Sequence, residues 1–140
     1  MQTNIQPGEL VFPAYVDLNG REGHLAKIVN ASGVAKVTTP TQATDQVLYV
    51  LTDCNKGANA PASCLPLSGT HNVRVWLVGT CNPGDVLVLE PAGPSGVGGK
   101  VKTVPETAGN YRMVGIAEEA GVDGQLVRMR PRNELVTVTE

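Results

Sequence analysis

The sequence predicts an all-β fold: a small β-barrel of short antiparallel strands with long loops and minimal helix. The 140 residues include twenty Val and twelve Thr. Such β-branched side chains favour the pleated, half-buried surface of a sheet and are poor helix formers. Sixteen Gly and ten Pro divide the chain into short segments bounded by turn residues, as in an all-β barrel or sandwich. The length is that of one ordinary domain.

Ten segments have the length and composition of strands. In two of them apolar and polar side chains alternate, with Arg74 and Trp76 on either side of Val75, and Arg128 and Arg130 flanking Met129. This alternation is typical of antiparallel strands with one solvated face. The predicted strands are Leu10–Val16, Leu25–Val29, Val34–Thr38, Val47–Thr52, Val73–Val78, Val86–Glu90, Lys100–Val104, Arg112–Ala117, Leu126–Arg130 and Leu135–Val138.

Turn and loop residues stand between these strands. Asn82–Asp85 and Asp123–Gly124 have the composition of tight turns. Residues 91–99 form a Gly-rich loop, and residues 55–70 are rich in Ala, Pro, Ser and Gly. At about sixteen residues the second loop exceeds the usual length, and such loops are often functional. Only Ala117–Ala120 is expected to be helical, for one turn.

The two halves of the chain share sequence patterns, which suggests an internal duplication of a β-unit. The spacing between matched segments varies, so the period is not strict. The alternative is that Val-rich strands following Pro-Gly turns resemble one another without a duplication. The matched pairs are Pro7–Val11 with Pro83–Leu87, Lys36–Pro40 with Val101–Pro105, and Asn72–Val75 with Gln125–Arg128.

The chain is predicted to comprise a mobile N-terminal arm over residues 1–8 and a single β-barrel-like domain over residues 9–140. The arm is polar, uncharged and ends in Pro7-Gly8, so alone it lacks the apolar surface that would fix it. Such a segment can become ordered on a partner. The arm residues expected to contact a partner surface or an adjacent subunit are Gln2, Thr3, Asn4, Ile5 and Gln6.

The charge and hydropathy patterns exclude several classes of partner. Eleven Lys and Arg stand against thirteen Asp and Glu, a formal net charge of −2, without the clustered positive charge that binds nucleic acid. The sequence has no apolar stretch long enough to span a membrane. The first residues have neither the positive nor the apolar region of a secretory signal. We expect no nucleic-acid or membrane partner and synthesis in a cytoplasm.

The three cysteines, Cys54, Cys64 and Cys81, are an odd number without Cys-x-x-Cys spacing. Three reduced thiols are expected, and a Cys54–Cys64 disulfide is the alternative. A zinc site that also includes His71 is rejected, because the spacings match no common ligand pattern. No metal or cofactor is expected.

The sequence contains no recognisable catalytic constellation. His24 and His71 are expected at the surface, and neither accompanies a nucleophile motif. Glu118 and Glu119 are interpreted as solvated turn charges. Trp76 is interpreted as a partly buried core or subunit-interface residue with its N–H at a wet edge. We therefore expect that the protein is not an enzyme.

Arg128, Arg130 and Arg132 form a local positive site on an acidic chain. One interpretation is an edge strand protected from aggregation by charge and by Pro131. The other is a contact with carboxylates of a protein partner.

Residues 82–130 resemble the small capsid decoration, or cement, proteins of tailed bacteriophages, and residues 7–78 resemble them loosely. The resemblance rests on Pro83-Gly84-Asp85 before a Val/Leu strand, on a Gly-rich loop, and on the segment Asn110–Val127 with its Ala/Gly turn and Asp-Gly. The 55–70 segment departs from the pattern.

This resemblance implies a β-barrel without catalytic site that binds the outer surface of an assembled phage head and stabilises it. It also implies a homotrimer, the major capsid protein as partner, a place on the virion surface and synthesis in the host cytoplasm. The alternative function is that of a small β-barrel ligand-binding or enzyme-accessory domain.

Overall fold

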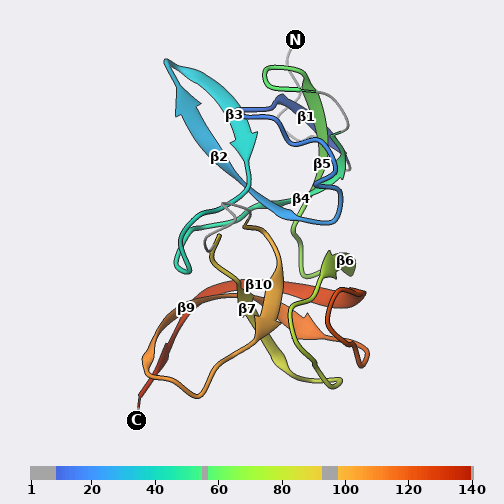
Figure 1. Cartoon of the computed structure of the whole chain (residues 1–140), viewed down its shortest axis with the longest axis vertical. Helices are drawn as coiled ribbons and strands as arrows, with labels where there is room; N and C mark the ends of the chain where they lie inside the picture. Colours follow the sequence, from blue (N-terminus) through green and yellow to red (C-terminus); the bar gives the residue numbers. More distant parts are fainter. Residues whose placement is uncertain (1–8, 55–56, 93–97, 140) are drawn as a thin grey trace.

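The computed structural model describes residues 9–54, 57–92 and 98–139. Its strands form two antiparallel sheets of five strands each (Figure 1), which confirms the predicted all-β fold. Within the described part of the chain, no helix is long and apolar enough to cross a membrane. The helical turn expected at Ala117–Ala120 is wrong, because Ala117 ends a strand and Glu118 and Glu119 form a bend.

The strand positions follow the sequence closely in most cases, and Val34–Thr38 agrees exactly. The two last predicted strands are one continuous strand of 13 residues, whose pairing is irregular between Pro131 and Glu134. The strands are β1 Leu10–Pro13, β2 Leu25–Ala31, β3 Val34–Thr38, β4 Tyr49–Asp53, β5 Pro61–Pro66, β6 Val73–Trp76, β7 Val86–Leu89, β8 Val101–Thr103, β9 Gly109–Ala117 and β10 Leu126–Val138.

The long loop expected at residues 55–70 is wrong over residues 61–66, which form β5. Ala62 and Cys64 point into the interior and are buried, so small side chains supply the inward face of this strand. β5 pairs with β1 on one side and with β4 on the other. The segment is therefore a central strand of its sheet.

The two sheets have the same topology. The first five strands are ordered β1-β5-β4-β2-β3, and the last five are ordered β6-β10-β9-β7-β8. When the strands of each half are numbered one to five along the chain, both orders read 1-5-4-2-3. In each half a parallel bridge joins the end of the first strand to the third, at Ala14–Val37 and at Leu77–Val101. Each sheet thus curves into a barrel-like unit, and we call these the first barrel (β1–β5) and the second barrel (β6–β10).

Residue pairs also correspond between the barrels. The Leu51–Cys64 pair of the first barrel matches the Ala117–Met129 pair of the second, which supports the predicted duplication. The match of Lys36–Pro40 with Val101–Pro105 is correct to within one residue, because Val37 corresponds to Val101.

The other two sequence matches are wrong. Pro7–Val11 leads into the first strand of its barrel, whereas Pro83–Leu87 leads into β7, the second strand of the other. Val73 and Leu126 lie on β6 and β10, two strands that pair with each other. Similar Val-rich patterns at different places in the barrel explain both errors.

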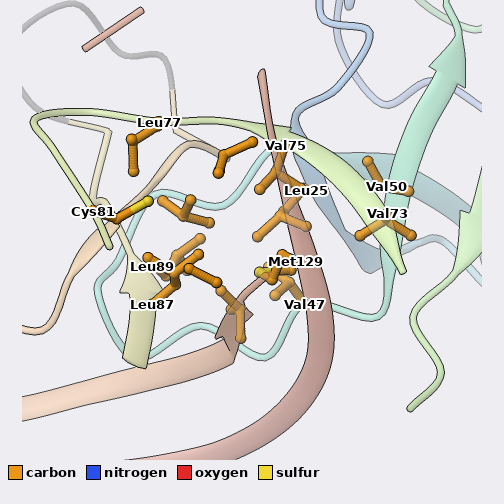
Figure 2. Packing of buried hydrophobic residues seen from close by; sticks show 14 residues of the cluster. Leu25, Val47, Val50, Val73, Val75, Leu77, Cys81, Leu87, Leu89 and Met129 are labelled. Atoms are coloured by element: carbon orange, nitrogen blue, oxygen red, sulfur yellow. The ribbon is translucent and has the colours of Figure 1, made fainter. Parts of the chain in front are cut away.

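One apolar cluster joins the two barrels. It contains the interior of the second barrel together with Leu25, Val47 and Val50 of the first (Figure 2). A separate cluster fills the first barrel. Burial of such side chains contributes about 25 cal/mol per Å² of apolar surface, so the shared cluster holds the barrels together. The strands are thus divided between two barrel-like units that share one apolar cluster, and the division into an arm over residues 1–8 and one domain over residues 9–140 stays a prediction.

Candidate interaction surfaces

The predicted arginine site lies on the outer face of β6 and β10. Val127 and Met129 are buried beneath it, as the alternation in the sequence predicts. Arg130 forms an ion pair with Glu118, with Nη2 3.1 Å from Oε2. Arg74 forms another with Glu119, with Nη1 3.0 Å from Oε1. We call this set of charges, with Arg128 and Arg132, the arginine surface.

Glu119 organises part of the arginine surface. Its Oε1 accepts a hydrogen bond from the backbone N–H of Arg128 at 2.9 Å and another from Arg74. The Arg128 N–H is the main cause that lowers the pKa of Glu119 below its ordinary value, and the Arg74 charge adds to it. A carboxylate that accepts such bonds is favoured in its charged form.

Arg132 lies further along β10 and is the most exposed of the three predicted arginines. Its side chain is 65% exposed, and Nε lies 3.7 Å from Oε1 of Glu134. The edge-strand interpretation is wrong for Arg128, because this residue lies between β6 and β9 and pairs with Arg74 of β6. The pairing with β6 covers only Leu126 to Met129, so Arg130 and Arg132 lie beyond it.

The sequence interpretation missed the role of Glu118 and Glu119. They are not merely solvated turn charges, because each is engaged by an arginine of the neighbouring strands. The sequence does contain a signal for this role. Two adjacent carboxylates are followed by a short turn and then by a strand on which Arg128 and Arg130 alternate with apolar residues. Opposite charges on adjacent segments of one sheet face interact across strands.

The second surface is the joint between the barrels. Trp76 on β6 donates its indole N–H to the carbonyl of Glu22 at 2.8 Å. Its backbone N–H donates to Gly23 at 3.3 Å. Trp76 is partly buried, as predicted, whereas its indole N–H, expected at a wet edge, is bonded within the chain at the joint. A cleft of about 380 Å³ beside it is lined mainly by apolar side chains, including Val50, Leu65 and Leu126.

The β3–β4 connection of the first barrel crosses onto the second barrel. The carbonyl of Ala43 accepts a hydrogen bond from the backbone N–H of Arg112 at 3.0 Å, and the carbonyl of Val47 accepts one from Nδ2 of Asn133 at 2.6 Å. These bonds attach the connection to β9 and β10. The joint therefore combines backbone and side-chain hydrogen bonds with the shared apolar cluster.

His24 is buried in this joint, with only 4% of its surface exposed. The expectation of a surface histidine is wrong for this residue, because the Gly98–Gly99 segment covers it: its Nδ1 lies 3.0 Å from the carbonyl oxygen of Gly98. Burial is the main cause that lowers the pKa of His24, and the neighbouring Arg21 and Lys100 charges act in the same direction. His71 is exposed, as expected.

A third surface lies on the outer face of β1 and β5. Val11 is 62% exposed, and with Pro13 and Pro61 it lines a shallow hollow of about 160 Å³. By the strand registers, this face of the first barrel corresponds to the outer face of β6 and β10. In the second barrel, that face packs against the first barrel. In that correspondence Pro13 takes the place of Trp76, and Pro61 takes that of Leu126.

The cysteines are free and buried, so the expectation of three reduced thiols is confirmed and the alternative disulfide is wrong. Burial raises the pKa of Cys54 and of Cys64 to about 11. No cluster of three or more metal-ligating side chains occurs among the residues that the structure describes. The predicted arm contacts, Gln2 to Gln6, lie outside the described residues.

No protein-family model and no curated protein matches this chain. Among solved structures, it is similar to the crystal structure of the head fiber gp8.5 N base in bacteriophage phi29. The TM-score is 0.61 with 20% sequence identity, and the match covers 89% of this chain and 94% of that chain. The chain therefore shares its fold with the base of a bacteriophage head fiber, in agreement with its resemblance to capsid decoration proteins.

Proposed function

We propose that this protein is a structural decoration protein that binds the outer surface of an assembled phage head and stabilises it. The observation that carries the proposal is the fold shared with a head fiber base over nearly the whole of both chains. The protein would be made in the host cytoplasm and then reside on the virion. Its role is binding, without catalysis or cofactor.

Stabilisation follows from selective binding. A protein that binds the assembled shell but not its dissociated subunits stabilises the shell by about 2.7 kcal/mol per site at one hundred times the dissociation constant. This contribution recurs at every occupied site. The shell then resists heat without any change in its covalent structure.

The partner in this proposal is the major capsid protein. Arg128, Arg130 and Arg132 supply part of the polar contact, since guanidinium groups bind carboxylates with charge-assisted hydrogen bonds. The intramolecular partners of Arg130 and Arg132 are only partly buried, with Glu118 at 28% and Glu134 at 49% side-chain exposure, so these two ion pairs can exchange for capsid carboxylates. The arm residues Gln2 to Gln6 are proposed to add a second contact.

The assembled form is proposed to be a homotrimer, and the joint supports this. The outer face of β6 and β10 meets the Glu22–His24 turn of the first barrel, so two different faces meet. On the equivalent face of the first barrel Val11 is exposed and Pro13 is half-buried, and Gly84, in the turn equivalent to Gly23, is exposed. Head-to-tail contacts of this kind close into rings when the rotation permits, and several copies that bind together gain avidity.

The test is to heat capsids with and without the protein and to measure capsid melting and DNA retention. We expect decorated capsids to melt at higher temperature and retain DNA longer. The Arg128→Ala, Arg130→Ala, Arg132→Ala triple variant should give less protection, and deletion of residues 2–7 should weaken binding. Unchanged melting and DNA retention after removal of the wild-type protein would contradict the stabilising function. Normal protection by the triple variant would remove the arginines from the proposal and leave the function standing.

A further inference from the structure

The imidazole of His24 is enclosed where the two barrels meet. Its Nδ1 lies 3.0 Å from the carbonyl oxygen of Gly98. Leu25, the residue after His24, makes a second contact with the same segment: its backbone N–H donates to the carbonyl of Gly99 at 2.8 Å. The start of β2 is thus attached to the segment that precedes β8, which connects the first barrel to the second.

The backbone around this ring is closely packed. A Cβ on Gly98 would lie 1.8 Å from the carbonyl oxygen of Pro40, and a Cβ on Gly99 would lie 2.7 Å from that of Leu25. Gly99 also has a φ of +96°, which favours glycine. The ring therefore cannot move far from the Gly98 carbonyl unless the segments of the joint separate.

The hydrogen bond fixes the protonation state of the ring. A carbonyl oxygen only accepts, so Nδ1 carries the hydrogen and Nε2 is unprotonated in the neutral ring. A second proton would place a positive charge in a buried site that already faces Arg21 and Lys100, with Glu22 as the opposing charge. Burial, the largest cause, opposes this charge and outweighs the hydrogen bond to Gly98, which favours it.

We propose that His24 makes the joint between the barrels acid-sensitive: a proton taken up at Nε2 separates the Gly98–Gly99 segment from β2 while both sheets persist. The sheets persist because their pairing does not involve this ring. The pKa of His24 in the joined form lies below its value in an exposed ring, about 6.5. The joint therefore keeps its full stability above that pH and loses it as the pH falls through the lowered pKa.

Trp76 reports on this event, because it is the one tryptophan in the sequence and its indole N–H donates to Glu22 across the joint. The experiment follows Trp76 fluorescence and far-UV circular dichroism of the full chain as the pH is lowered. We expect the emission to move to longer wavelength, with a midpoint below about 6.5, while the sheet signal stays constant. The change should reverse when the pH is restored.

Two variants test whether His24, and not another titratable group, causes the fluorescence transition. His24→Gln retains a donor for Gly98 but takes up no proton, so the fluorescence transition should disappear. His71→Gln removes the exposed histidine and should leave the transition unchanged. In the wild type, the NMR titration of the His24 ring and the shift of the Trp76 indole N–H should share one midpoint, a readout that survives if His24→Gln fails to fold. Different midpoints, a transition retained in His24→Gln, or no transition at all would overturn the proposal.

Discussion

Arg74 and Arg128 stand directly opposite each other on the paired strands β6 and β10, and the carboxylate of Glu119 binds both residues. Like charges in this position destabilise a sheet. Glu119→Gln removes the charge that offsets them, so we expect a lower free energy of unfolding. Urea unfolding measures the change.

The same interaction depends on pH. The pKa of Glu119 is lowered in the folded protein, first by the Arg128 N–H and then by the Arg74 charge. The stabilisation that Glu119 gives the folded protein is therefore present at pH values above the ordinary carboxyl pKa, and it is lost as the pH falls through the lowered pKa. Glu106→Gln is the control, since Glu106 is exposed. Equal effects of the two variants at neutral pH would contradict the assigned role of Glu119.

The thiols are expected to be inert in the folded protein. The thiolate is the reactive form, and with a pKa of about 11 Cys54 and Cys64 hold little of it at mildly alkaline pH. Cys81 is also buried with a raised pKa. A thiol reagent should modify none of the three rapidly, and all of them after denaturation in urea. Rapid labelling of the native protein at any one of them would show that its site opens.

Gly98 is expected to be the glycine of the joint that tolerates substitution least. In Gly98→Ala the new methyl group would meet the Pro40 carbonyl at 1.8 Å, so the two segments must move apart. We expect a loss of about 1–3 kcal/mol or more, the usual cost of overpacking, measured by urea unfolding. Gly57→Ala is the matched control, because no atom lies within 4 Å of its added Cβ. A Gly98→Ala variant as stable as this control would contradict the packing of the joint.

The sequence predicts what depends on local pattern. The alternation of Arg128 and Arg130 with Met129 identified the two faces of a strand correctly, and Val34–Thr38 was located exactly. β5 was missed because Pro61 and Pro66 bound a run of small side chains that has a loop's composition. Its burial comes from pairing with β1, which begins 51 residues earlier in the chain.

The candidate surfaces depended on long-range contacts and were predicted less well. His24 was expected at the surface because nothing near it in the chain indicates burial, and the Gly98 carbonyl that covers it is 74 residues away. Glu119 precedes Arg128 by nine residues, yet its bond with Arg74 spans 45. The duplication was visible only where equivalent strands kept similar residues, as around Val37 and Val101. Equivalent positions that diverged, such as Pro13 and Trp76, were recognised only through the strand registers.

The proposed head-to-tail contact makes Val11 a sensitive position. On the second barrel, the equivalent face of β6 and β10 packs against the turn at Gly23. On the first barrel, Pro13 takes the place of Trp76 and would receive the Gly84 turn of another copy, and Val11 beside it is 62% exposed. Val11→Glu places a charge in that contact without disturbing the interior, so the folded monomer should keep its stability. Burying a charge that has no partner costs several kcal/mol, enough to dissociate the copies.

The measurement is the mass of the protein in solution and its occupancy on capsids, each as a function of concentration. We expect Val11→Glu to remain monomeric and to decorate capsids with at least tenfold lower apparent affinity, because the loss of avidity alone reaches that size. Leu135→Glu is the matched control, since Leu135 is similarly exposed at 52% and pairs with Arg112 of β9, at a distance along that strand from Ala117, the residue to which Gly84 is hydrogen-bonded. If Val11→Glu assembles and decorates as the control does, the first-barrel face is not the contact between copies. The ring would then have to close through another surface.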